Sequence, residues 1–174
     1  MRLENKKNVL VVVNNAAAQP LRYGKFKDSA APIAIAHGND LPIFRYADAL
    51  LTYAEAAKMA NGAPTALALE RLNMVKRRGY GVSPASPNAT IDFTLAGQSM
   101  AAFRELVLTE RAYEFMSKAK RWFDIKRLGV NRVKEIIKVS KNVDVKDAHL
   151  FWPLPVQEID NNPDINPKDQ NPGY

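Results

Sequence analysis

The chain contains no cysteine and only two histidines, His37 and His149. The absence of cysteine excludes disulfide bonds, thiol nucleophiles and thiolate-bound zinc or iron–sulfur sites, and it excludes a lipid-modified cysteine within these residues. General acid–base and nucleophilic catalysis mostly recruit histidine, cysteine, serine or paired carboxylates. Because the two histidines lie in separate loop-like contexts, no catalytic triad can be nominated. We therefore expect a protein that is not an enzyme and that needs no cofactor.

Long apolar runs are also missing. The basic start is followed by a run of five apolar residues at positions 9–13. A secretion-signal core needs roughly 7–15 such residues, and a membrane-spanning helix needs about 20. We interpret the run as a short strand, or as an internal stretch exposed by truncation.

Positive charge is in excess, with a formal net charge of +7 and a pI near 9.6. Such a charge suits an anionic partner such as nucleic acid or a lipid surface, but it names none. Residues 118–141 are the most basic stretch, and no aromatic residues alternate with the charges in a stacking pattern. We interpret the stretch as a solvated basic face or a face that docks on a partner, and we do not expect nucleic-acid binding. Two alternatives remain: a basic helical domain that binds nucleic acid or anionic membrane, and a structural adaptor that docks a protein partner.

The prolines gather toward the two ends, which places regular structure in the middle. A helix is predicted from Pro42 in its first turn to Ala60, with Gly62 as its left-handed stop. Two apolar stripes lie beside each other on this helix, so we expect it to be covered on more than one side. The first stripe is Tyr46, Leu50, Tyr53, Ala57 and Ala60, the second is Phe44, Ala47, Leu51 and Ala54, and a narrow polar line is formed by Arg45, Asp48, Thr52 and Glu55.

A second helix is predicted from Pro64 to Arg78, ended by Gly79, so that the two helices form an antiparallel hairpin like a tetratricopeptide unit. After a surface loop, Ser99 is expected to cap a long helix that runs to Arg127. A shorter helix is predicted over residues 131–139, residues 150–155 should be extended, and residues 160–174 should form turns. The predicted fold class is mainly α, an α–α superhelix with irregular proline-rich ends.

An ordered set of sequence blocks resembles the C-terminal region of the RagB/SusD family. The blocks are residues 23–28 (YGKFKD), 45–56 (RYADALLTYAEA), 72–79 (LNMVKRRG), 110–115 (ERAYEF), 121–127 (RWFDIKR), 152–155 (WPLP), 158–160 (EID) and 170–174 (QNPGY). Each block alone is a weak signal, but their order is specific. The resemblance implies a lead-in over residues 1–40 and a single C-terminal domain over residues 41–174, as a fragment of a longer protein or as a truncated homologue.

The resemblance also implies a function. Proteins of this family are outer-membrane lipoproteins, exposed at the cell surface, that capture oligosaccharide or glycopeptide and pass it to a TonB-dependent transporter. The expected role of this part is scaffold, because the family's ligand contacts come mostly from its larger N-terminal part. The residues that carry the resemblance and are expected to make structural contacts are Arg45, Tyr46, Asp48, Tyr53, Glu55, Glu110, Arg111, Glu114, Arg121, Trp122, Asp124 and Arg127.

One departure from the family pattern lies in the predicted long helix. Family members often have Glu-Gly where this chain has Lys118 and Ala119. Alanine favours helix over glycine by roughly 0.5–1 kcal/mol, so we expect the helix to continue through this point.

Two groups of polar residues permit a functional interpretation beside a structural one. Glu110 and Glu114 lie four residues apart on one helix face, whereas glycosidase carboxylates flank their substrate from opposing sides, so ion pairing is favoured. Asp160, Asn162 and Asp164 imitate the start of a calcium loop, but the glycine and the bidentate glutamate are absent, which favours Asx-turns.

Aromatic residues are the candidates for stacking on sugar rings. Trp122 and Trp152 are both expected to be packed inside the protein. Tyr80, at a helix end beside the proline-rich loop, is a weak candidate for an exposed glycan contact.

Overall fold

The computed structural model describes residues 42–174 throughout and, before them, only residues 10–11, 22–23, 28, 30–33, 36 and 38–40. The chain separates into two compact units, Met1–Lys118 and Ala119–Tyr174. The predicted boundary at residue 40 falls beside residues outside the described ones, so the domain division stays a prediction. His37 and residues 24–27 of the first sequence block also lie outside the described residues.

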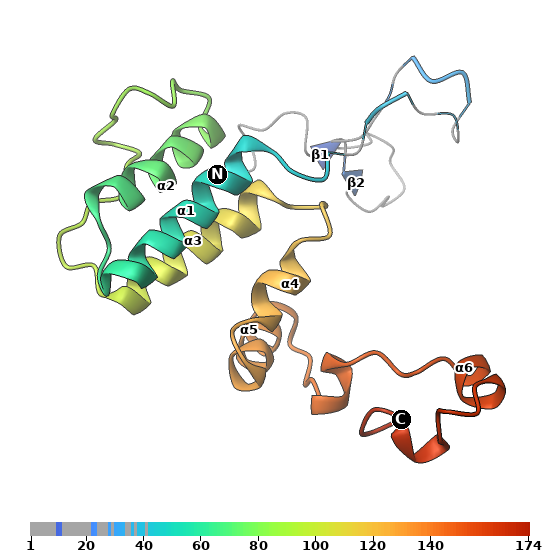
Figure 1. Ribbon diagram of the computed structural model, residues 1–174. Helices are drawn as coiled ribbons and strands as arrows, with labels where there is room; N and C mark the ends of the chain where they lie inside the picture. The colour runs from blue at the N-terminus through green and yellow to red at the C-terminus, as the bar shows by residue number, and fades with distance from the viewer. Residues whose placement is uncertain are drawn as a thin grey trace. The chain divides into compact units, whose positions relative to one another are not determined.

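The first unit is built on an antiparallel hairpin of two helices, α1 (Tyr46–Asn61) and α2 (Ala66–Gly79) (Figure 1). Gly62 ends α1 with φ at 67°, as predicted. Both helices begin later than predicted, and Pro42 and Pro64 lie before them. Thr65 caps the start of α2, where its hydroxyl oxygen accepts the N–H of Ala68 at 3.1 Å. The hairpin itself is confirmed.

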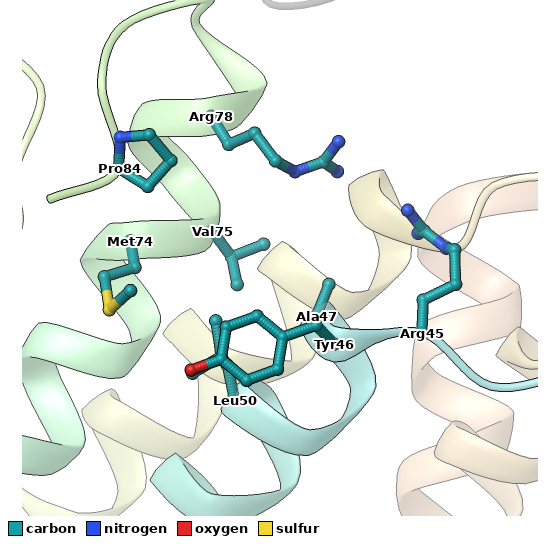
Figure 2. A pocket seen from close by; sticks show the side chains of 8 residues that line it. All are labelled: Arg45, Tyr46, Ala47, Leu50, Met74, Val75, Arg78 and Pro84. Atoms are coloured by element: carbon teal, nitrogen blue, oxygen red, sulfur yellow. The ribbon is translucent and has the colours of Figure 1, made fainter.

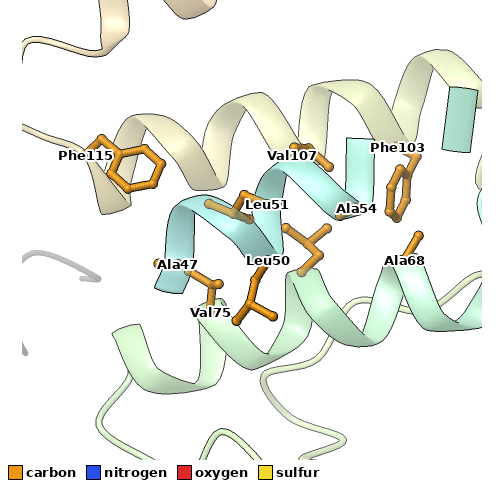
Figure 3. Packing of buried hydrophobic residues seen from close by; sticks show 10 residues of the cluster. Ala47, Leu50, Leu51, Ala54, Ala68, Val75, Phe103, Val107 and Phe115 are labelled. Atoms are coloured by element: carbon orange, nitrogen blue, oxygen red, sulfur yellow. The ribbon is translucent and has the colours of Figure 1, made fainter. Parts of the chain in front are cut away.

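A third helix, α3 (Met100–Glu114), lies along the hairpin and contacts both of its members. Ser99 caps it, as predicted, by accepting the N–H of Ala102 at 3.1 Å. Small and large side chains interlock where the three helices meet, so that the backbones approach closely (Figure 3). The buried apolar core of the unit is Ala47, Leu50, Leu51, Ala54, Ala68, Leu72, Val75, Phe103, Val107 and Phe115.

Of the two apolar stripes predicted on α1, the second is buried from Ala47 onward, whereas the first is largely exposed except at Leu50. The side that faces α2 and α3 is the second stripe with Ala47, Leu51 and Ala54, whereas Tyr46 is 70% exposed and Tyr53 is 44% exposed. The polar line is also buried at Asp48 and Glu55. Helical periodicity finds apolar faces, but it does not say which of two adjacent faces is covered.

The long helix predicted from Ser99 to Arg127 is wrong, since α3 stops at Glu114 and a separate helix, α4 (Arg121–Lys126), follows. Between them, Ser117 and Ala119 adopt left-handed backbone conformations, with φ at 60° and 55°. An L-residue pays roughly 1–2 kcal/mol in that region. Ala119 therefore occupies a turn in which glycine would be less strained, rather than a helix that alanine extends.

The second unit packs α4 against α5 (Val130–Lys141), which confirms the shorter helix predicted over residues 131–139. Its buried apolar core is small and consists of Ile125, Val133 and Leu150, with Trp122, Ile136, Ile137 and Val145 packed around them. None of the helices in the described part of the chain is long and apolar enough to cross a membrane.

The tail returns to the segment that precedes it. Leu150 ends a 3₁₀ turn, η1 (Asp147–Leu150), and the chain is then extended up to α6 (Val156–Asn161). Gln170 exchanges two hydrogen bonds with the backbone of Leu154, at 2.7 and 3.1 Å. The Tyr174 hydroxyl donates toward the carbonyls of Ala148 and Phe151, at 3.1 and 3.0 Å.

The tail departs from its prediction in two respects. Helix α6 extends into the predicted turn region, and a second 3₁₀ turn, η2 (Pro167–Asp169), follows it. The extended conformation predicted for residues 150–155 is confirmed from Phe151 onward.

The lead-in contributes two short strands, β1 (Leu10–Val11) and β2 (Arg22–Tyr23), which pair antiparallel with Leu10 opposite Tyr23. A strand was predicted within residues 9–13, and β1 lies there. With helices making up nearly all the regular structure described, the predicted mainly α fold class is confirmed.

The strained turn gives the first prediction. Ala119→Gly should raise the free energy of unfolding by about 0.5–1 kcal/mol, because glycine adopts positive φ without steric cost. Ala56→Gly is the matched control, since this exposed alanine lies inside α1, where glycine should lower stability by about 1 kcal/mol. Urea unfolding measures both. Equal destabilisation by the two changes would contradict the left-handed conformation of Ala119.

Candidate functional site

One buried carboxylate joins the ends of all three helices of the first unit. Nη2 of Arg45, just before α1, and Nη2 of Arg78, in the last turn of α2, both donate to Oε1 of Glu114 at the end of α3. The side chain of Glu114 is 2% exposed, against 27% for Arg45 and 47% for Arg78. We call these three residues the Glu114 cluster.

Further groups surround the Glu114 cluster. The backbone N–H of Arg45 donates to Oδ2 of Asp48 at 3.1 Å, which caps the start of α1. The guanidinium carbons of Arg45 and Arg111 lie 5.8 and 5.0 Å from the ring centre of Phe115, within the range of cation–π attraction. A cation that precedes α1 and a cation of α3 thus lie near one buried aromatic ring.

A second polar cluster fixes the loop that follows α2. Arg77, whose side chain is 1% exposed, uses Nε and Nη2 to bind both oxygens of Asp92, at 2.7 and 2.6 Å. Nη1 and Nη2 bind both oxygens of Glu70, each at 2.8 Å, and Nη1 also donates to the carbonyl of Pro84 at 2.8 Å. Every N–H of this guanidinium is therefore used, which removes most of the cost of burying it. We call Arg77, Glu70 and Asp92 the Arg77 cluster.

Two further contacts press the same loop onto α2. The amide of Asn73 exchanges hydrogen bonds with the backbone of Phe93, at 3.0 and 2.9 Å. Nζ of Lys76 lies 3.3 Å from the centre of the Phe93 ring. The surface loop predicted between Gly81 and Gly97 is thus an ordered structure that α2 holds in place.

The Arg77 cluster changes the ionisation of its members. The hydrogen bonds from Arg77 hold the pKa of Asp92 below its usual value of 3.8. Partial burial of the carboxyl acts to raise this pKa, whereas the hydrogen bond from the backbone N–H of Asn88 and the charge of Lys76 lower it further. The hydrogen bonds to Asp92 and then Glu70 raise the pKa of Arg77. Both groups are therefore charged across the physiological range.

A pocket of about 240 Å³ opens between the start of α1 and the second half of α2, at the Glu114 cluster (Figure 2). Its lining is apolar except for two arginines and the hydroxyl of a tyrosine. Figure 2 shows the guanidinium ends of Arg78 and Arg45 extending toward each other on one side, with Met74 and Pro84 on the other side. The full lining is Arg45, Tyr46, Ala47, Leu50, Met74, Val75, Arg78 and Pro84.

The structure brings some of the predicted residues together. Arg45, Asp48 and Glu114 meet at the Glu114 cluster. Asp124 and Arg127 form an ion pair at 3.8 Å in the second unit. The other predicted residues lie on the helices as follows: Tyr46, Tyr53 and Glu55 on α1, Glu110 and Arg111 on α3, and Arg121 and Trp122 on α4.

The aromatic candidates fare differently. Trp122 is partly buried against the core of the second unit, so its predicted packing is confirmed. Trp152 is 80% exposed, and its predicted packing is wrong, because its backbone rather than its ring is held, through a 2.6 Å bond from Asn171 Nδ2 to its carbonyl. Tyr80 caps the end of α2 and is only half-exposed, so it is a poorer surface candidate than its sequence context suggested.

The structure supports a structural role, not a catalytic one, for the carboxylates of Glu110 and Glu114. Glu110 is 1% exposed and Glu114 is bound by two arginines, so neither faces a substrate-sized opening from the opposing sides that glycoside hydrolysis needs. In the tail, Asn162 Oδ1 accepts the N–H of Asp164 at 3.0 Å, which is the predicted Asx-turn before proline.

The basic stretch is partly neutralised by acids nearby. Arg132 pairs with Glu135 at 2.6 Å, and Lys138 pairs with Asp144 at 2.7 Å. Lys134 similarly pairs with Asp147 at 2.5 Å. These exposed pairs contribute little stability, but they reduce the positive charge that the stretch offers to a polyanion.

Sequence reasoning missed the most buried cation, Arg77, and the pocket-lining role of Arg78. The signal for Arg77 was present: Glu70, Asn73 and Arg77 recur at helical spacing on a side of α2 that also carries buried apolar residues. Polar residues on a buried face require hydrogen-bonding partners. Here several of the partners lie in the loop that follows α2, and helical periodicity does not show that this loop folds back onto the helix.

The hairpin, the third helix against it and the returning tail define a helical, tetratricopeptide-like protein. The chain belongs to the SusD family, whose profile matches residues 13–174. This confirms the resemblance to the C-terminal region of RagB/SusD proteins.

Three relatives illustrate the match. A SusD-like protein of Formosa agariphila is 27% identical over 145 residues, which are 79% of this chain and 25% of that protein. The crystal structure of a SusD homologue from Bacteroides thetaiotaomicron has a TM-score of 0.61 and 30% identity, covering 76% of this chain and 26% of the other. That of a SusD-superfamily protein from Parabacteroides distasonis has a TM-score of 0.63 and 26% identity, covering 88% and 32%. The chain thus spans about a quarter to a third of the length of these relatives.

Arg77→Met gives the second prediction. The change leaves Glu70 and Asp92 without their shared cation, and removing one partner of a buried pair costs about 3–5 kcal/mol of unfolding free energy. Arg104→Met is the control, because Arg104 is half-exposed on α3 and should change stability by less than about 0.5 kcal/mol. Urea unfolding compares the two. A loss below 1 kcal/mol for Arg77→Met would show that the Arg77 cluster is not what holds the loop.

Acid should weaken the Arg77 cluster, which gives the third prediction. Because the pKa of Asp92 is lowered by folding, its stabilisation is fully present above the unfolded value of 3.8 and is lost as pH falls below it. The difference in unfolding free energy between the wild type and Asp92→Asn should therefore be constant near neutral pH and shrink below 3.8. Urea unfolding at several pH values measures it. A difference that grows on acidification would have the wrong sign.

Proposed function

We propose that the whole protein containing this chain captures an oligosaccharide or glycopeptide at the cell surface and hands it unchanged to a TonB-dependent transporter of the outer membrane. In this proposal a lipid anchor in the full-length protein holds it at the outer membrane, and the protein does no chemistry. The observation that carries the proposal is the match of residues 13–174 to the SusD family.

Within that function, we assign this chain mainly to the scaffold. The residues by which it resembles the family include Arg45, Asp48 and Glu114, which contact one another at the helix ends rather than lining a large open site. Asp124 is likewise 4% exposed in the second unit. Side chains in such contacts hold helices in position, and this supports a framework role.

The local chemistry supports binding more than catalysis. The carboxylates nearest to a pocket are already engaged, because Glu114 accepts from two arginines and Asp48 caps α1. A general acid or base must reach a substrate proton directly or through one water. Groups committed to helix packing in this way favour a protein that holds its ligand without reacting with it.

The fourth prediction concerns the ligand. The full-length protein that carries this chain should bind particular oligosaccharides on a glycan array, and isothermal titration calorimetry should confirm the strongest hit. Deleting the gene should slow growth on that glycan, because capture precedes uptake. Absence of binding to any glycan, together with unaltered uptake after deletion, would refute the proposal.

A salt titration separates this function from polyanion binding. A protein that neutralises several phosphates loses affinity for DNA by orders of magnitude as salt rises. We expect no such steep dependence, since Arg132, Lys134 and Lys138 are paired with acids. Co-purification with the neighbouring transporter tests the handover separately, and a protein that binds glycan but never the transporter would disprove only the second half of the proposal.

A further inference from the structure

We propose that the pocket at the Glu114 cluster binds a small carboxylate with an apolar body, such as an aryl- or branched alkyl-carboxylate. This site is separate from the proposed glycan capture and does not depend on it. The proposal rests on three properties of the pocket: its charge, its apolar interior and its size.

The charge of the lining has one sign. Of the eight residues that line the pocket, two are arginines and none is acidic. The carboxylate that both arginines share, Glu114, lies beneath them at 2% exposure, so two guanidiniums face one buried carboxylate. These three residues together carry a net charge of +1 at the edge of the pocket, which favours an anion there.

The arginines also have donors to spare. The bonds that the described residues show for Arg78 use Nη2 alone, toward Glu114, and its side chain is 47% exposed. A guanidinium carries further N–H groups in a planar fork that suits a carboxylate, and bonds between charged partners are the stronger ones. Arg78 can therefore hold Glu114 and a ligand carboxylate together, with Arg45 facing it (Figure 2).

The interior of the pocket is apolar, and the residues at its base are buried. Leu50 is 8% exposed and Val75 is 2% exposed, while Met74 and Pro84 form a wall and the ring of Tyr46 contributes an aromatic edge. Hydroxyl-rich sugars would leave their polar groups without partners against this surface, which is unfavourable. An aromatic or branched alkyl group would instead gain from burial, and Met74 offers a deformable, polarisable contact.

The size limits the ligand to one such group. The volume of about 240 Å³ lies below the range of roughly 300–1,000 Å³ that holds drug-sized molecules. It suits a single ring or branched chain with its carboxylate at the arginine edge. The ligand can be a free acid or the C-terminal residue of a peptide, because both present the same chemistry.

Methyl NMR of Met74 gives a direct test in the whole protein. The ¹³C-methyl signal of Met74, assigned by its loss in Met74→Leu, should shift on titration with 3-phenylpropionate up to about 10 mM, a range that detects the weak affinities of small ligands. 3-Phenylpropionamide has the same shape without the charge and should bind about tenfold more weakly or worse. No shift with the acid, or equal binding of acid and amide, would overturn the proposal.

Substitutions test whether Arg78 binds the carboxylate of the ligand. Arg78→Met removes the guanidinium but keeps an unbranched, flexible side chain, and it should weaken binding of the acid about tenfold, while Arg104→Met on α3 should leave it unchanged. Tyr46 is 70% exposed, so Tyr46→Ala should preserve the fold and still reduce affinity. If neither Arg78→Met nor Tyr46→Ala weakens binding, the ligand lies elsewhere and the assignment is wrong.

Two peptides distinguish the sources of the carboxylate. A short peptide that ends in phenylalanine with a free carboxylate is compared with the same peptide as its C-terminal amide. Binding of the free-carboxylate peptide as tight as that of 3-phenylpropionate favours a peptide ligand, and much weaker binding favours a free acid. Glycan calorimetry on the same sample keeps the two functions apart, because loss of glycan binding with retained carboxylate binding counts against glycan capture alone.

Discussion

The first unit depends on a single buried carboxylate. Glu114 ends α3 and receives both the arginine that precedes α1 and the arginine that finishes α2, so one charge fixes three helix ends at once. The apolar core between the helices supplies most of the attraction, but the hydrophobic effect is non-directional. Directional bonds at the helix ends add to the register that side-chain packing favours, and they also hold two guanidiniums at the rim of the pocket between α1 and α2.

Much of the helical framework could be predicted from the sequence. Periodicity and capping residues located the hairpin, the start of α3 at Ser99 and the helix α5, because each signal is local and has a steric or hydrogen-bonding cause. The break after Glu114 could not be predicted, since Ala119 favours helix and adopts φ of 55° only because the surrounding structure requires it. Likewise, both apolar faces of α1 had helical spacing, and only tertiary packing decides which one is covered.

The candidate site could be predicted only in part. Sequence blocks pointed to Arg45 and Glu114, but pairing residues that are 69 positions apart needs the fold. Arg77 lies in the sequence block of residues 72–79, but no role could be predicted for it, because its partner Asp92 lies in an irregular loop. The exposure of Trp152 was missed for a related reason: an apolar side chain in an extended segment carries no periodicity that shows its direction.

The way the loop after α2 is attached also bears on how such proteins diverge. The loop is tied down at Pro84 by Arg77 and again from Asn88 to Phe93 through Asp92 and Asn73. Residues 85–87 between these ties carry little of the attachment, so insertions there should cost little folding free energy. Evolution can therefore lengthen or re-shape this loop tip while the helices that carry the loop stay the same. Because Pro84 lines the pocket, such changes would alter access to the pocket without altering the helical scaffold.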